Sequence, residues 1–300
     1  MIARDALMVD EVEGDEVGTD EVGTDKVEGP GSTTSALRLA HPAHREIAAR
    51  AVVAGSVALH GFANIYVLTA SSDVRASERL NLLCGRSPHA PAWVTTTPER
   101  LDTVTDWAAL AEGLDAWEAR AVISELVASG PIGLRLPASV GVPDHLVSMH
   151  EGVRCIQVML AGVACASGGF LSRTLDIAGG DLLAIQPACR VVANQGVIVQ
   201  EPVHHRFDEA LRDFGGHVGV IPLGREDDLA ERTYLTYAPT RPSVLSFQGV
   251  RFDRRNRPLI PIETHGSLAL ERMTAVLDRY DLGHVVLPGA QRRLAARLYR

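Results

Sequence analysis

The chain has 300 residues, of which 46% are hydrophobic and 5% aromatic, so it can bury one large core or two modest ones. No apolar run approaches the roughly 18 to 20 residues that span a bilayer, and the first residues are acidic, so we expect a cytoplasmic protein without membrane contact. The only lysine is Lys26, in a segment that we expect to be disordered, which excludes Schiff-base and P-loop chemistry from the folded region.

Residues 1–36 carry the whole net charge of the chain. They hold ten acidic residues against Arg4 and Lys26, a net charge of −8 that equals the total, so the remaining residues sum to zero. A unit of five residues occurs four times, with small variations, between Asp10 and Gly29. A period of five matches neither helix nor strand, and glycine in every unit disfavours both, so we predict a disordered acidic repeat tail over residues 1–36.

Nothing in the sequence indicates a metal site. His204 and His205 begin a predicted helix, where neighbouring side chains point about 100° apart and cannot both bind one metal ion without distortion. The cysteines are far apart and form no C-x-x-C pair, which favours buried thiols without disulfides. They are Cys84, Cys155, Cys165 and Cys189.

The stretch from residue 51 to residue 95 alternates between helix and strand patterns. An apolar helix end closes at Gly55, and a basic turn holds Arg86. The alternation predicts an α/β domain. The expected elements are strands Ser56–Leu59 and Asn64–Thr69, helix Val74–Leu83, turn Cys84–Pro88 and a strand that begins near Pro91.

The alternation continues to about residue 280, and we predict one α/β domain over residues 37–285. Arg135 lies in the middle of an apolar strand, and because an unpaired buried charge is costly, it must meet a pocket, a partner carboxylate or solvent. The further expected elements are helix Ala116–Ala128, strand Ile132–Pro137, a helix near Val142–Met149, strand Cys155–Leu160, helix His204–Phe214, strand Arg241–Phe247 and helix Leu268–Tyr280.

Two stretches carry a resemblance to a known family. The first stretch is Gly55–Ala58 followed by Ile65–Leu68, and the second is Cys84–Pro88. Together they resemble the start of the YrdC-like family, the threonylcarbamoyl-adenylate synthases and their relatives. That family reads G-G-x-V-x-x-P-T-(D/E)-T-V-Y-G-L at the first stretch and K-G-R-P-x-x-x-P-L at the second. The resemblance implies a twisted mixed β-sheet flanked by helices, with a concave ligand groove. Residues 181–240 are longer than the family's usual connection, and we interpret them as an enlarged insertion.

The resemblance also implies roles for single residues. Arg86 would bind a phosphate of the nucleotide. Ser167 and Gly168 match the end of the family's S-A-N-x-S-G, and Ser243 matches its P-S-T-V-V-D-L strand, so these residues would also lie near the nucleotide. Arg135 matches V-x-V-R-x-P and would hold a substrate carboxylate; a salt-bridged or surface arginine is the alternative.

His60 falls near the family's Pro-Thr motif and is a candidate proton donor or acceptor, although a histidine at a strand end is more often merely solvated.

The chain also departs from the family pattern. Cys84 stands where the family has lysine, and Val163 and Cys165 stand where its serine and asparagine contact the nucleotide. Residues 263–265 replace its Arg-Pro-Gly. An arginine from elsewhere, such as Arg173 or Arg190, is a candidate replacement for the lysine.

The C-terminal region is basic, with eleven arginines against five acidic residues between Arg241 and Arg300. Leu294 and Leu298 lie one turn apart, which predicts a basic C-terminal helix over residues 286–300. A solvated helix packed by these leucines is the simpler interpretation. The functional alternative is contact with RNA through the clustered arginines.

Three functional hypotheses follow. The first is an enzyme that forms or uses a carbamoyl- or acyl-adenylate with ATP and Mg²⁺, and takes a small-molecule substrate such as a nucleotide, an amino acid, bicarbonate or a carbamoyl donor. The second is a catalytically inactive YrdC-like module that binds a nucleotide, RNA or a protein partner. The third is a specialised transferase in which residues 181–240 form part of an altered site.

Overall fold

The computed structural model describes residues 37–163, 165–194, 197–200, 202–234 and 241–290. The predicted acidic tail, residues 1–36, and residues 291–300 of the predicted basic helix lie outside the described residues. These described residues belong to one compact unit. Within the described part of the chain, no helix is long and apolar enough to cross a membrane.

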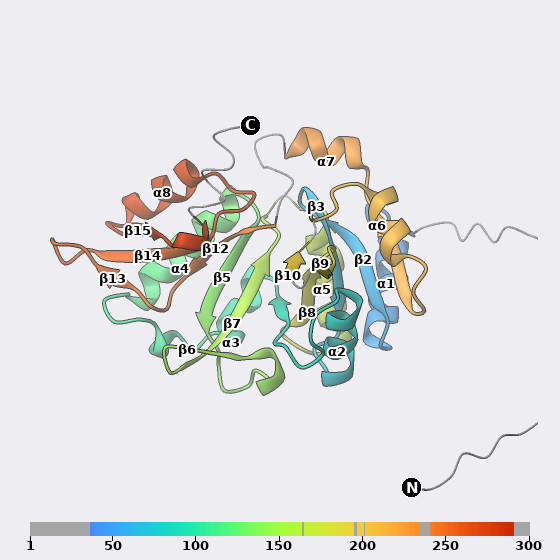
Figure 1. Ribbon diagram of the computed structural model, residues 1–300, viewed down its shortest axis with the longest axis horizontal. Coiled ribbons are helices and arrows are strands. Elements are labelled where there is room, and N and C mark those ends of the chain that lie inside the picture. Colours follow the sequence, from blue (N-terminus) through green and yellow to red (C-terminus); the bar gives the residue numbers. More distant parts are fainter. Residues whose placement is uncertain (1–36, 164, 195–196, 201, 235–240, 291–300) are drawn as a thin grey trace, which may run out of the picture. The chain divides into compact units, whose positions relative to one another are not determined.

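Thirteen strands of the described residues form one mixed sheet, with the order β1-β11-β2-β3-β8-β4-β7-β5-β12-β14-β13, while β15 pairs with β14 and β6 with β7 (Figure 1). Their bounds are β1 Leu37–Arg38, β2 Val57–Phe62, β3 Ile65–Ala70, β4 Trp93–Thr95, β5 Ile132–Pro137, β6 Ser148–His150, β7 Val153–Leu160, β8 Leu183–Pro187, β11 Val220–Gly224, β12 Ser243–Ser246, β13 Arg251–Phe252, β14 Pro258–Thr264 and β15 Gly283–Val286. A separate hairpin consists of β9 Val191–Asn194 and β10 Val197–Gln200.

The sheet confirms the predicted fold class. β2 and β3 form an antiparallel hairpin, whereas β2 pairs in parallel with β11. Residues 181–240 supply two strands of this sheet, since β8 lies between β3 and β4, and β11 lies beside β2. Part of the segment that we interpret as an enlarged insertion therefore lies within the large sheet, while β9 and β10 of the same segment pair only with each other.

Eight α-helices of the described residues flank the sheet (Figure 1). Asp73 and Asp115 cap two of them by accepting hydrogen bonds from first-turn amides, which is why α2 and α4 begin where the sequence predicts. The bounds are α1 Pro42–Val53, α2 Val74–Leu83, α3 Leu101–Val104, α4 Ala116–Ser129, α5 Ser167–Ala178, α6 Phe207–Phe214, α7 Asp227–Thr233 and α8 Leu270–Arg279.

The predicted helix near Val142–Met149 is wrong. This segment forms one 3₁₀ turn, Asp144–Leu146, and then β6, which pairs with β7. Pro143 has an extended conformation before the turn, and the edge of β7 gives the following residues a strand partner. Pairing with a distant strand outweighs the local helix pattern here.

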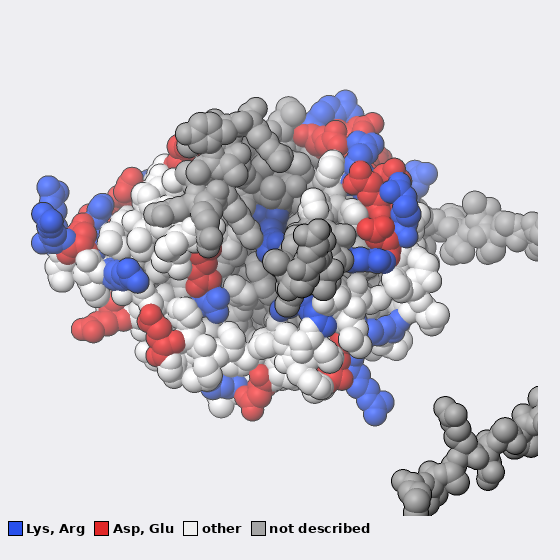
Figure 2. Space-filling view, in the orientation of Figure 1, with Lys and Arg blue, Asp and Glu red and all other residues white. Residues whose placement is uncertain are grey.

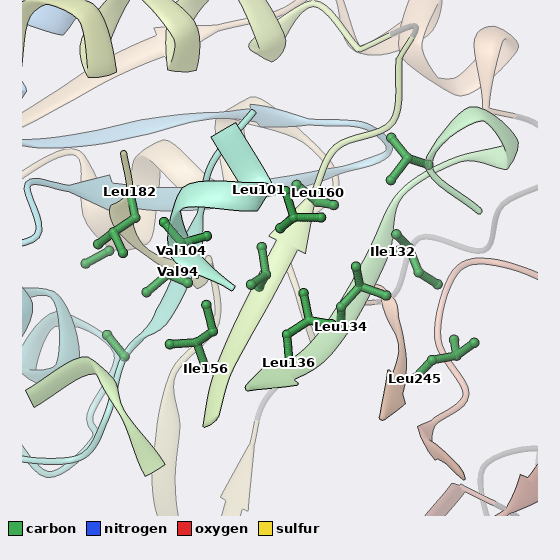
Figure 3. Packing of buried hydrophobic residues seen from close by; sticks show 14 of the residues in the cluster. Val94, Leu101, Val104, Ile132, Leu134, Leu136, Ile156, Leu160, Leu182 and Leu245 are labelled. Atoms are coloured by element: carbon green, nitrogen blue, oxygen red, sulfur yellow. The ribbon is translucent and has the colours of Figure 1, made fainter. Parts of the chain in front are cut away.

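Alternate residues of the central strands divide the core between the two faces of the sheet. Val57 of β2 packs in the cluster that includes α2 and α4, whereas Ala58 packs in the cluster that includes α1 and α5. Figure 3 shows the first cluster, where the alternate residues Ile132, Leu134 and Leu136 of β5 meet neighbouring strands. Arg135 consequently points to the other face.

The central position of Leu134 generates a stability prediction. Leu134→Ala removes a fully buried side chain from this cluster, so we expect the free energy of unfolding to fall by about 2–5 kcal/mol in urea denaturation. Val140→Ala is the control, because Val140 is 95% exposed and its loss should change stability by at most about 0.5 kcal/mol. Equal effects of the two substitutions would contradict the described core.

Candidate functional site

Arg135 forms a two-pronged ion pair with Glu263 of β14. Its Nε donates to Glu263 Oε1 at 2.7 Å and its Nη2 to Oε2 at 2.9 Å. The two side chains keep only 16% and 13% of their surface exposed. Of the alternatives that the sequence left open for Arg135, the structure therefore contains the partner carboxylate.

The surroundings of this pair are polar but mostly closed. Nη1 of Arg135 donates to Ser148 Oγ at 3.5 Å, and burial raises the pKa of the nearby Cys155 thiol to about 11. Gln157 lies opposite Arg135 in the β5–β7 register and is partly exposed. Figure 2 shows that the molecule is hollowed between the two halves of the sheet, with basic side chains in the hollow.

Arg86 lies in the turn after α2 and is held by its own chain. Its Nη1 donates to Asn81 Oδ1 at 3.1 Å, and its Nη2 donates to the carbonyl oxygen of Pro91 at 3.2 Å. Burial lowers the pKa of Arg86, although the side chain is partly exposed. It is thus an oriented cation that retains some access to solvent.

The end of β8 lies beside this turn. Gln186 Nε2 donates to Asn81 Oδ1 at 3.4 Å, and Cys84 Sγ lies 3.9 Å from the carbonyl oxygen of Pro187. Burial raises the pKa of Cys84 to about 12, so the thiol that stands at the family's lysine position is neutral. Sequence reasoning missed β8 as a neighbour of Arg86, because its apolar run carries no charged residue that would mark a site.

Ser167 and Gly168 begin α5, which packs against a different part of the sheet from the Arg86 turn. The Oγ of Ser167 lies 3.0 Å from Cys165 Sγ, which also accepts a hydrogen bond from the amide of Ala63 at 3.1 Å. Helix α5 packs against one face of the β2–β3 hairpin and α2 against the other. The structure therefore does not bring Ser167 and Gly168 together with Arg86.

Ser243 is fully buried and tied to the backbone. Its hydroxyl donates to the carbonyl oxygen of Leu268 at 2.9 Å and accepts from the amide of Gly266 at 2.9 Å. A Cβ at position 266 would lie 2.1 Å from the carbonyl oxygen of Arg241, so only glycine fits this approach. Ser243 fastens β12 to the segment before α8.

His60 is also fully buried, inside β2, which extends beyond the predicted strand end. Nδ1 lies 3.0 Å from the carbonyl oxygen of Gly61, which can only accept, so Nδ1 carries the proton of the neutral ring. Nε2 then accepts from the Thr69 hydroxyl at 2.8 Å. Burial lowers the pKa of His60 to about 4, and the ring packs edge-on against Phe170, so it has no access to a ligand here.

The two arginines considered as replacements for the family lysine lie in different places. Arg173 pairs with Glu46 on the exposed surface. Arg190 donates to the carbonyl oxygen of Asp213 at 2.7 Å and lines the same cavity, of about 420 Å³, as Gly85. Arg190 is therefore the closer of the two to the Arg86 turn.

One charged cluster has no counterpart in the sequence motifs. The Tyr66 hydroxyl donates to Asp227 Oδ1 at 2.7 Å, and Arg225 Nε contacts the same carboxylate at 3.2 Å. Burial, with this hydrogen bond, raises the pKa of Tyr66 well above its ordinary value. The sequence separation of 161 residues between Tyr66 and Asp227 explains why no local signal could have found the cluster. Among the described residues, no group of three or more His, Cys, Asp or Glu residues is arranged to hold a metal ion.

The ion pair leads to a stability prediction. Glu263→Ala leaves the Arg135 charge without its carboxylate in a mostly buried place, so we expect unfolding to become easier by about 3 kcal/mol in urea denaturation. Asp144→Ala is the matched control, because it breaks the exposed Arg154–Asp144 pair, which should contribute at most about 1 kcal/mol. Similar losses in both variants would show that Arg135 does not depend on Glu263.

The buried histidine leads to a pH prediction. His60 is neutral in the folded chain down to its pKa of about 4, whereas in the unfolded chain it binds a proton below its usual pKa of 6.5. Between these values the unfolded state holds more protons, so stability falls as pH falls, by up to about 3 kcal/mol. Urea titrations from pH 7 to pH 4 should show a smaller decrease for His60→Gln than for the wild type. The exposed His217→Gln control should keep the wild-type slope.

Comparisons with known proteins agree with the fold. No protein-family model matches the sequence, and no curated protein is significantly similar to it. The chain is similar to P. abyssi Sua5 complexed with L-threonine, with a TM-score of 0.56, 18% identity, and coverage of 81% of this chain and 59% of that one. It is also similar to the hypothetical protein smu.1377c from Streptococcus mutans UA159, with a TM-score of 0.54, 16% identity, and coverage of 79% of this chain and 93% of that one.

The chain thus spans about three-fifths of the length of the P. abyssi protein. Identities of this size establish the fold alone. The described chain has the fold of the Sua5/YrdC structures, as the sequence resemblance predicts.

Proposed function

We propose that this chain is a YrdC-like small-molecule-binding module that does not form adenylates. One observation carries the proposal. The fork of Arg135, which the resemblance assigns to a substrate carboxylate, is bound on both prongs by Glu263 of the chain itself. An amino-acid substrate would have to displace a well-oriented internal carboxylate to bind there.

The residues present do not fit ATP and Mg²⁺ in the manner that the resemblance implies. Adenylate formation at a triphosphate needs several positive groups around the phosphates. Here a neutral thiol, Cys84, stands at the lysine position, and Arg135 is neutralised by Glu263. The hydroxyl of Ser243 is committed to backbone partners, so it offers nothing to a nucleotide.

Arg86 is the group best suited to receive an anion. Asn81 and Pro91 fix its guanidinium, and the side chain is partly exposed. A single oriented cation suits a ligand with one phosphate or a comparable anionic group better than it suits a triphosphate. We therefore propose a nucleoside monophosphate or a similar small anion as the ligand class.

A second candidate is a specialised transferase with an altered substrate. One observation favours it: β8 and Arg190, both from residues 181–240, lie near the Arg86 turn, so this segment would contribute to an altered site. RNA binding through residues 291–300 concerns a part of the chain outside the described residues, and it stays a separate hypothesis.

Isothermal titration tests the proposal. We expect AMP to bind the full chain, and we expect Arg86→Ala to weaken that binding at least about tenfold, because the mutation removes the oriented cation. Arg173→Ala is the control, since Arg173 is an exposed arginine paired with Glu46.

The same samples, with ATP, Mg²⁺, threonine and bicarbonate, should release no pyrophosphate above the background of a protein-free sample. Pyrophosphate release that is lost in both Arg86→Ala and Arg135→Ala would overturn the proposal in favour of an adenylate-forming enzyme. Release that survives Arg135→Ala but requires Arg190 would favour the transferase with an altered substrate.

A further inference from the structure

The turn between β13 and β14 concentrates positive charge. Residues 251–257, which we name the basic hairpin, read R-F-D-R-R-N-R and hold four arginines against one aspartate, a net charge of +3. In Figure 1 this turn lies at one end of the described unit, beyond β15, and Figure 2 shows a group of basic side chains at the same end. Because residues 37–300 together carry no net charge, this concentration is a local feature and not a general excess of arginine.

The basic hairpin lies apart from the groups that the resemblance assigns to a ligand. β13 is the last strand of the sheet order, whereas the Arg86 turn lies beside β8, with five strands between them. Glu263, the partner of Arg135, follows Arg257 by six residues along β14, which corresponds to roughly 20 Å of extended strand. None of the stretches that resemble the YrdC-like family includes the basic hairpin.

The carboxylate of Asp253 organises the turn. Its Oδ1 accepts hydrogen bonds from the amides of Arg255 and Arg257 at 2.8 Å and 3.0 Å, and its Oδ2 accepts one from Nε of Arg257 at 3.2 Å. The amide of Asn256 donates to the carbonyl oxygen of Asp253 at 3.0 Å. Asn256 has a left-handed φ of 60°, which asparagine tolerates better than most residues. These contacts hold the turn in one conformation and occupy its only carboxylate.

Two further contacts fasten the base of the basic hairpin, where β13 pairs with the start of β14. The ring of Phe252 packs over Gly113, where a Cβ would lie 2.7 Å from the ring. On the other side, Nη1 of Arg257 lies 3.8 Å from Asp278 of α8. A partner would therefore meet a preformed two-stranded ribbon, and binding would require little ordering of the backbone.

Three of the four arginines keep their charge available. Arg251, Arg254 and Arg255 are exposed, and no acidic side chain of the described residues pairs with them. Arg257, in contrast, pairs with Asp253. A free guanidinium presents its donors in a planar fork that matches the oxygens of a phosphate. The exposed surface of the basic hairpin therefore fits a partner that presents several phosphates in a row.

We infer that the basic hairpin binds the phosphate backbone of double-stranded DNA. The strands of a ribbon lie about 4.8 Å apart, and the major groove of B-form DNA, about 12 Å wide, admits such a ribbon. The major groove of an RNA duplex is deep and narrow and does not. A DNA duplex also carries one negative charge per about 1.7 Å of its axis, a denser row of anions than an acidic protein segment presents.

The charge of the whole chain limits the strength of this binding. A net charge of −8 opposes the approach of DNA, but about 0.1 M salt screens charges more than roughly 10 Å away, so the local charge of the basic hairpin decides the contact. Contacts to phosphates alone carry no sequence information. We therefore expect weak binding without sequence preference. This surface is separate from the proposed binding of AMP and does not depend on it.

Fluorescence anisotropy of the full chain with a labelled DNA duplex of about 20 base pairs tests the inference. We expect a Kd between roughly 1 and 100 µM near 100 mM NaCl, and a slope of log K against log salt of about −2.7, for three phosphates. The double variant Arg254→Ala/Arg255→Ala should bind at least about tenfold more weakly and reduce the slope to about −1. The control Arg75→Ala/Arg212→Ala removes two exposed arginines from α2 and α6, so it changes the net charge equally and should bind like the wild type.

Several results would overturn the inference. They are absence of saturable binding at low salt, unchanged binding in Arg254→Ala/Arg255→Ala, and equal weakening in Arg75→Ala/Arg212→Ala, which would indicate a general effect of charge. Equal competition by an RNA duplex or by polyglutamate would assign the surface to a different class of partner. AMP binding should be the same in Arg254→Ala/Arg255→Ala as in the wild type, so failure of this inference is distinguishable from failure of the proposed function.

Discussion

The ion pair between Arg135 and Glu263 is the interaction on which the central part of the structure depends. It joins β5 to β14 across β12, which lies between them in the sheet. The pair has two hydrogen bonds and both side chains are mostly buried. Removing either partner would therefore leave the charge of the other one buried and unpaired, which is energetically costly. Because the pair is complete within the chain, both prongs of the Arg135 guanidinium are already occupied by a carboxylate of the chain itself.

Elements with sharp local signals could be predicted from the sequence. The expected helix Val74–Leu83 and strand Ile132–Pro137 have the observed bounds. Asp73 caps the helix and Gly85 follows it, and the strand is a continuous run that is buried at every position except Arg135. The helix expected near Val142–Met149 does not form, because this segment lacks such a local signal. Its outcome depended on pairing with β7, which no pattern inside the segment reveals.

The candidate site was harder to predict than the fold, because its contacts join residues far apart in sequence. Arg135 and Glu263 are 128 residues apart, so a partner carboxylate could be named as an alternative but not identified. Ser-Gly at the start of α5 matched a motif, yet α5 and the Arg86 turn belong to different faces of the sheet. Short motifs specify local backbone, while the side of the sheet on which they fall is set by topology.

Two departures from the family pattern both make the surroundings of an arginine less positive. A thiol at Cys84 in place of lysine removes a positive charge beside Arg86, and burial keeps that thiol neutral. A carboxylate at Glu263, where the family has an arginine, adds a negative charge beside Arg135. The changes lie in different strands and turns, yet each one reduces the positive charge beside an arginine, Arg86 in one case and Arg135 in the other. A chain with less positive charge beside both arginines is suited, under the proposed function, to a ligand with fewer negative groups than ATP and an amino acid together.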